Sequence, residues 1–142
     1  MDNILASRSF RDRAQPAAIE AVHSHLDSLW KDASFVPEID RMTFATAVVE
    51  AACNVVQHAV PDSAKPVDLG VDICIRETSL RAEVSAFGAT APDLVLTDPT
   101  MPDEEAESGR GLALIQALVT TVTFRRTDGT NTWVLSRDSH PA

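Results

Sequence analysis

Three polar side chains recur at every fourth residue within the stretch FATAVVEAACNVVQHA, residues 44–59 of this 142-residue chain. They are Glu50, Asn54 and His58, and on a helix that turns about 100° per residue they share one edge. A carboxylate can take up a proton or orient a water molecule, and an amide oxygen can coordinate a hard cation. The spacing makes Glu50 a candidate base and Asn54 a candidate metal ligand, although a solvated helix edge has the same spacing.

The same stretch carries an apolar stripe that predicts packing on a core. Its members are Phe44, Ala47, Val48, Ala51 and Val55, widened by Ala45, Val49, Ala52 and Val56. We expect a loop over residues 34–40, a cap at Asp40 or Thr43, and the run PDSAKP to end the helix after Val60.

A second group of residues could hold an anion. Gly109 and Gly111 stand directly before the apolar periodic run of residues 112–119, and glycines before a helix let backbone N–H groups approach a negative group. No Lys-Ser or Lys-Thr pair follows, so this is not the common phosphate loop. Arg110 would reach a phosphate or remain a solvated charge. The alternative to an anion site is that Ser108 is simply the N-cap of an ordinary helix.

The remaining elements follow from apolar periodicity. We expect a short edge strand over residues 7–13, a helix from Pro16 to about Ala33, a hairpin of 67–76 with 80–87, and a hairpin of 122–126 with 132–136 across Asp128-Gly129. This order predicts an α+β fold, with helices on one face of a mostly antiparallel sheet. Residues 1–142 fit a single domain.

The segment from Gly88 to Glu107 contains three prolines and six acidic residues. A connection of this length inside a compact domain is usually functional or disordered. We treat it as a hypothetical lid.

Composition excludes several classes of function. The net charge of −9 argues against direct binding of nucleic acid. No run of eighteen apolar residues and no leader-like N-terminus is present, so we expect no membrane segment and a cytoplasmic protein. Cys53 and Cys74 are expected to be buried free thiols. His23 and His25, two apart on a helix, should point in different directions rather than bind a metal together.

Taken in order, these motifs resemble the histidine-kinase-like ATPase (GHKL) superfamily and, more closely, its anti-sigma-factor serine/threonine kinase branch. The resemblance rests on E-A-A-C-N-x-x-x-H-A, V-S-A-F-G, the acidic segment, G-R-G-L-A-L-I and a final G-T, and covers roughly residues 10–137. It implies the family's two-layer α/β sandwich, the Bergerat-type ATP-binding fold.

The resemblance also implies roles for individual residues. Asn54 would hold a Mg²⁺ ion that bridges the phosphates of ATP, and Glu50 would act as the base. The other residues implied to bind ATP are Gly88, Gly109, Arg110, Gly111 and Thr130. The implied activity is phosphorylation of a small anti-anti-sigma (STAS-type) protein by a regulator that otherwise holds a sigma factor inactive. Relatives often form homodimers.

One departure from the family pattern favours an alternative. The first glycine box normally begins with an Asp that accepts a hydrogen bond from the adenine amino group, and the matching position is Ala86. A hydrogen bond to a charged acceptor contributes roughly 1.5–3 kcal/mol, so ATP binding would weaken by about ten- to a hundredfold. The alternative is a protein-binding module that has lost the nucleotide. A third hypothesis is a metal-dependent hydrolase that uses His58 with Glu50.

Overall fold

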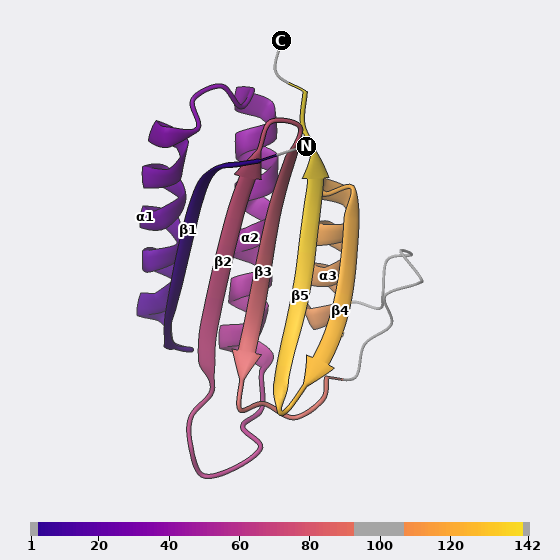
Figure 1. The fold of residues 1–142 in the computed structure, drawn as a ribbon. Helices are drawn as coiled ribbons and strands as arrows, with labels where there is room; N and C mark the ends of the chain where they lie inside the picture. Colours follow the sequence, from indigo (N-terminus) through magenta and orange to yellow (C-terminus); the bar gives the residue numbers. More distant parts are fainter. Residues whose placement is uncertain (1–2, 93–106, 141–142) are drawn as a thin grey trace.

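The computed structural model describes residues 3–92 and 107–140, and for residues 107–111 it describes the backbone alone. Figure 1 shows the elements in chain order. They are β1 (Ile4–Arg13), α1 (Pro16–Asp32), α2 (Glu38–His58), β2 (Asp68–Arg76), β3 (Ser79–Phe87), α3 (Glu107–Leu118), β4 (Thr121–Thr127) and β5 (Thr130–Asp138).

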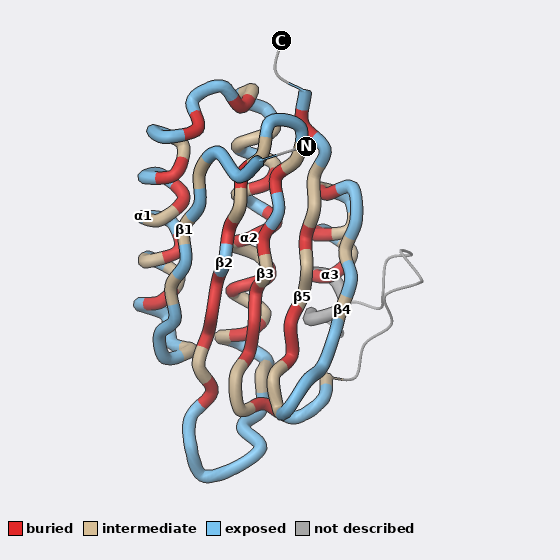
Figure 2. The backbone as a smooth tube through the Cα atoms, in the orientation of Figure 1, coloured by how far each residue is buried: buried red, intermediate tan, exposed pale blue. Residues whose placement is uncertain are grey.

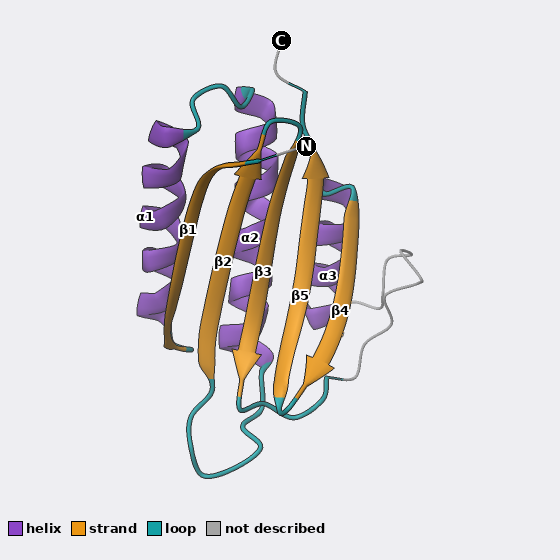
Figure 3. Cartoon of the chain, viewed as in Figure 1, coloured by secondary structure: helices purple, strands orange, loops and turns teal. Residues whose placement is uncertain are grey.

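The strands form one sheet in the order β1-β2-β3-β5-β4, and every neighbouring pair is antiparallel. All three helices cover the same face of this sheet (Figure 3). The expected α+β fold with helices on one face is therefore confirmed, and β1 is an edge strand as expected. The β4–β5 turn has positive φ at Asp128 (51°) and Gly129 (76°), which is typical of a tight two-residue hairpin turn.

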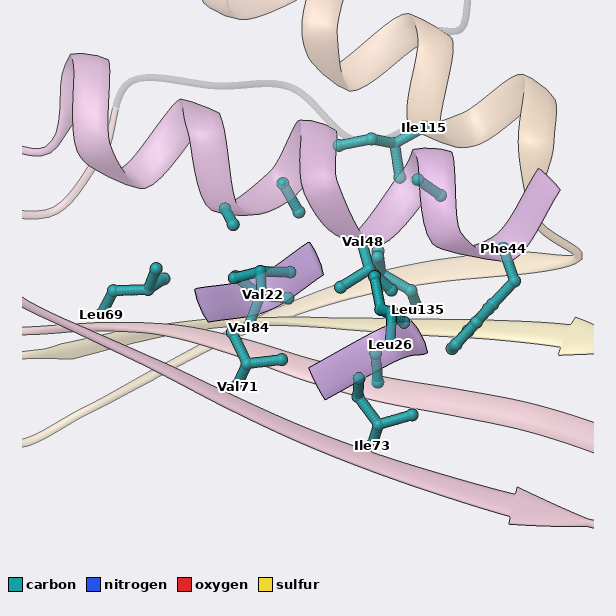
Figure 4. Packing of buried hydrophobic residues seen from close by; sticks show 14 of the residues in the cluster. Val22, Leu26, Phe44, Val48, Leu69, Val71, Ile73, Val84, Ile115 and Leu135 are labelled. Atoms are coloured by element: carbon teal, nitrogen blue, oxygen red, sulfur yellow. The ribbon is translucent and has the colours of Figure 1, made fainter. Parts of the chain in front are cut away.

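The core lies between the middle strands and α2. Alternate residues of β2 point toward the helices and are almost fully buried. The predicted apolar stripe of α2 packs on them. Figure 4 shows Phe44 and Val48 on this helix above Val71 and Ile73. Burying each such side chain contributes about 1.5–3 kcal/mol. Burial falls off toward β1 and β4 at the two edges (Figure 2).

The start of α2 differs from the sequence expectation. The helix begins at Glu38, and Pro37 precedes it in an extended conformation without a side-chain cap. Neither Asp40 nor Thr43 is the cap, because both lie inside the helix. Thr43 Oγ1 donates to the carbonyl of Ile39 at 2.6 Å, while Asp40 binds a residue distant in the sequence.

That distant residue is Arg137, near the end of β5. Its guanidinium donates to Asp40 Oδ1 at 3.0 Å and to the carbonyl of Leu118 at 2.7 Å, and Ser139 Oγ donates to Asp40 Oδ2 at 2.9 Å. The side chains of Arg137 and Asp40 are 24% and 13% exposed. This cluster joins the start of α2, the end of α3 and the end of β5.

Both cysteines are free, as expected, but they are half-buried rather than buried. Within residues 3–92 and 107–140, no helix combines the length and apolar character needed to cross a membrane.

We predict that Arg137→Met lowers the free energy of unfolding by about 2–3 kcal/mol, because it removes the positive partner of Asp40 and leaves Asp40 Oδ1 and the Leu118 carbonyl without the Arg137 donor. Urea denaturation measures this change. The matched control is Arg125→Met, since Arg125 is 56% exposed and pairs with Glu83 at 2.9 Å. In this control the free energy of unfolding should fall by less than about 1 kcal/mol. An equal decrease in the two variants would contradict a structural role for the Arg137 cluster.

Candidate functional site

The orientation of α2 decides which of its polar residues can contribute to a site. One side of the helix faces α1, across a groove lined by residues of both helices: Pro16, Ile19, Glu20, His23, Cys53, Val56 and Gln57. Asn54 lies about 160° around the helix from Val56 but about 60° from Gln57, and Glu50 lies about 20° from Gln57. Helix α2 also contacts α3. Glu50 and Asn54 are half-buried, whereas His58 is exposed.

The histidines do not form a metal site with these residues. His23 lines the α1–α2 groove, while His25 stacks on Phe10 with ring centroids 4.7 Å apart, so the two point apart as expected. Over the described part of the chain, no three His, Cys, Asp or Glu side chains gather where they could hold a metal ion. The hydrolase hypothesis therefore gains no support.

The start of α3 lies at the same end of the sheet as the end of α2. The two helices run side by side in opposite directions (Figure 1). Because α3 begins at Glu107, Gly109 and Gly111 lie inside its first turns rather than before it, which corrects the expected boundary. The N–H of Gly109 is still among the first four of the helix, which have no partner within it. The positive end of the helix dipole also lies here.

Ala86, which the resemblance aligns with the family's adenine-binding Asp, lies near the end of β3. It is fully buried and shares the helix-facing side of the sheet with its cross-strand neighbours Leu69 and Asn131. Asn131 is 2% exposed. The side chain of β5 that lies beside Ala86 is thus the amide of Asn131.

Thr130, by contrast, does not lie beside Ala86. It pairs with Phe87, one residue further along β3, and successive residues of a strand point to opposite faces. Phe87 lies on the face away from the helices, since a Cβ added at Gly70 would meet its ring at 2.5 Å and Arg11 stacks on it at 3.8 Å. Thr130 therefore faces away from the helix layer.

Gly88 follows β3 with a φ of 75°. The segment 88–90 forms backbone hydrogen bonds with the β4–β5 turn and with the chain that follows α2. The N–H groups of its first two residues donate to the carbonyl of Gly129 at 3.0 and 3.1 Å, and the third donates to Val60 at 2.8 Å. In return, the N–H of Asp62 donates to the carbonyl of Gly88 at 3.0 Å. The backbone N–H of Gly88 is therefore already used within the protein.

The two remaining carbonyls of this segment bind side chains of the β4–β5 hairpin. Arg126 Nη1 donates to the carbonyl of Ala89 at 2.8 Å and to Asn131 Oδ1 at 2.5 Å. Asn131 Nδ2 donates to the carbonyl of Thr90 at 2.7 Å. We call this pair the Arg126–Asn131 clasp. The sequence pattern did not single out Arg126 or Asn131, although a two-residue turn at Asp128-Gly129 places residues 126 and 131 opposite each other.

The expected lid was assigned to residues 88–107, and residues 93–106 of it lie outside the described part of the chain. The structure therefore does not test that hypothesis. The structure does describe the segment that leads out of β3, which is hydrogen-bonded to Val60, Asp62 and Gly129.

Glu50 influences the chemistry of a neighbouring thiol. The pKa of Cys53 is raised above its usual value, first because burial disfavours the thiolate and second because the negative charge of Glu50 does the same. Cys53 is therefore a poor nucleophile at neutral pH.

Comparison with known proteins agrees with the fold and the motifs. The family model described as "Histidine kinase-like ATPase domain" matches residues 13–137. The chain belongs to the histidine kinase-like ATPase family, as the resemblance predicted. No curated protein matches the chain.

Among solved structures, the chain is similar to the crystal structure of the RsbU and RsbW domains of Rv1364c from Mycobacterium tuberculosis, with a TM-score of 0.68 and 20% sequence identity. The match covers 96% of this chain and 33% of that one, so the chain spans about a third of that protein's length. At this level of identity the likeness shows a shared fold.

We predict that Glu50→Gln speeds alkylation of Cys53 by iodoacetamide at pH 8, in a Cys74→Ser background, by about two- to fivefold. Removing the carboxylate charge lowers the pKa of the thiol and so increases the thiolate fraction. Mass spectrometry of timed aliquots measures the rate. Glu38→Gln, at the far end of the same helix, is the control and should leave the rate unchanged. An unchanged rate in Glu50→Gln would show that the two side chains do not interact.

Proposed function

We propose that this chain is an anti-sigma regulatory factor that acts in the cytoplasm as an ATP-dependent serine/threonine kinase on an anti-anti-sigma protein. The single observation that carries this proposal is the pair Glu50 and Asn54, half-buried one turn apart on α2, the helix that contacts α3, in a chain of the histidine kinase-like ATPase family. The fold likeness to a protein with an RsbW domain supports it.

In the proposed reaction, residues 1–142 act as one ATPase domain. Asn54 is a ligand of Mg²⁺, which neutralises charge on the triphosphate when it is bound. Glu50 accepts the proton of the substrate hydroxyl as that oxygen attacks the γ-phosphorus, and the bond from the γ-phosphorus to the β,γ-bridging oxygen breaks to release ADP. The first N–H groups of α3, that of Gly109 included, lie near the phosphates together with Arg110 and Gly111. Catalysis then depends mainly on positioning and on electrostatic stabilisation.

The proposed partners are a sigma factor, which the protein holds inactive, and the anti-anti-sigma protein, which displaces it until phosphorylated. Neither contact involves nucleic acid, in agreement with the net charge of −9.

The test is transfer of label from radioactive ATP to an anti-anti-sigma protein encoded in the same genome. Glu50→Gln should reduce the transfer rate about 10²–10⁴-fold, because a positioned general base contributes that much. Binding of Mg-ATP should change little, since Glu50 is not a proposed ligand of the nucleotide. Glu38→Gln is again the control. Label transfer that is unaffected in Glu50→Gln would remove Glu50 from the mechanism.

A second candidate function is a protein-binding module that holds its partner without nucleotide. Ala86 and the Arg126–Asn131 clasp favour it, since the first lacks a polar side chain and the second uses hydrogen-bonding groups at the end of β3.

Calorimetric titration with Mg-ATP separates the two functions. A saturable heat with a dissociation constant below about 1 mM, lost in Asn54→Ala, supports the kinase. Absence of heat at millimolar nucleotide, together with unchanged binding to the sigma factor, supports the module instead.

A further inference from the structure

The apolar surface of α2 continues past the stripe that packs on the sheet. Met42, Val49 and Val56 follow each other at intervals of seven residues, and together with Cys53 they fall within an arc of about 60° on the helix surface. Met42 is 60% exposed, and the other three are half-buried. A surface helix normally has one apolar stripe and a polar opposite face. The additional apolar arc of α2 is therefore a surface that another element would cover.

Helix α1 forms the opposite wall of the groove beside this arc. Ile19 near the start of α1 lines the groove together with Val56 near the end of α2, while Trp30 near the end of α1 contacts Phe44 near the start of α2, with ring centroids 6.4 Å apart. The two helices therefore run antiparallel, on the same face of the sheet (Figure 3). The α1–α2 groove between them has mainly apolar walls and a volume of about 430 Å³.

The shape of this surface favours a helix as its occupant. The stretch from Met42 to Val56 extends about 21 Å along α2, which is longer than a small molecule needs. An extended segment would place unpaired backbone N–H and C=O groups against apolar walls, whereas a helix satisfies its own backbone groups. An amphipathic helix that lays its apolar face into a hydrophobic groove is a common mode of protein recognition.

Charge determines which kind of helix fits. Helices α1 and α2 together carry six acidic side chains and two basic ones, so their surface is acidic at neutral pH. Glu20 lines the groove, and Asp27, two turns further along α1, lies about 20° from it around the helix. Both side chains belong to exposed residues. A second copy of this chain would place the same acidic surface against itself, whereas basic side chains would complement it.

We propose that the α1–α2 groove docks an amphipathic helix of a partner protein, whose apolar face is flanked by lysine or arginine side chains. The apolar residues of that helix pack on Ile19, Cys53 and Val56, and its basic residues lie beside Glu20 and Asp27. Single apolar residues on a surface are ordinary, but here they line one groove with an acidic rim. The docking site does not depend on nucleotide, so its failure would leave the proposed kinase function untouched.

The first test uses a peptide of leucine and lysine, 17 residues long like α1, with the leucines on one face of a helix. Titration of the full chain should give a dissociation constant below about 100 μM, and the affinity should fall at high salt. A peptide with glutamate in place of lysine should bind at least about tenfold more weakly. Equal affinities for the two peptides would overturn the charge selection. No binding of the lysine peptide at about 1 mM would overturn the site.

Alkylation of the two cysteines locates the bound peptide. Cys53 lines the groove, whereas Cys74 faces away from the helices, because its strand neighbours Ile73 and Ile75 are the buried ones. Saturating lysine peptide should slow alkylation of Cys53 by iodoacetamide at least about fivefold and leave the rate at Cys74 unchanged. Binding that leaves Cys53 unprotected would place the peptide elsewhere and overturn the proposal.

Two pairs of variants test the apolar wall and the acidic rim. Met42→Gln should weaken binding of the lysine peptide by about tenfold, while Leu114→Gln, at a 42% exposed position on α3, should not. Glu20→Lys should weaken it by about three- to tenfold, while Asp138→Lys, at an exposed position at the end of β5, should not. Effects no larger than those of the matched controls would overturn the proposed contacts.

Sedimentation equilibrium tests a second copy as the occupant. We expect the wild-type chain without peptide to leave Cys53 equally reactive at low and high protein concentration. A dimer that protects Cys53 and dissociates in Met42→Gln would show that a second copy fills the α1–α2 groove, and would overturn the proposal of a basic partner helix.

Discussion

The packing of the α2 stripe on the middle of the sheet is the constraint on which the remaining structure depends. Phe44, Val48 and Val55 are at most 1% exposed, and removing a buried side chain of this kind costs several kcal/mol. A helix held in this way has one allowed rotation about its axis. Once that rotation is fixed, Cys53 lines the groove toward α1, and Glu50 and Asn54 are half-buried at fixed positions around the helix.

Polar contacts hold the two ends of α2 and differ in kind. At the start of the helix, Asp40 forms a partly buried ion pair with Arg137, which also donates to the carbonyl of Leu118, the last residue of α3. At the other end, the chain leaving the helix pairs with the segment after β3 through Val60 and Asp62. The helix is therefore fixed along its axis as well as around it, and the backbone positions of its polar residues are fixed with it.

The Arg126–Asn131 clasp shows how the fold accommodates a buried polar side chain beside its core. In most of the sheet, the side chains that face the helices are apolar and simply fill the core. Beside Ala86 the chain has a buried amide instead, and a buried polar group is tolerated only if its hydrogen bonds are satisfied. Asn131 meets that condition through Arg126 and Thr90. The resulting bonds stabilise the segment after β3 without a ligand.

The sequence alone determined the helices, the strands and their faces, because apolar periodicity reports directly which side of an element is buried. Pro16 marked the start of α1, and the stripe of α2 was predicted residue by residue. The order of motifs was also sufficient to predict the family. Local patterns could not determine contacts between elements distant in the chain. The pairing of Asp40 with Arg137, the facing of Thr130 away from Ala86, and the clasp all depend on strand register and helix rotation, which only the packing of the whole sheet against its helices decides.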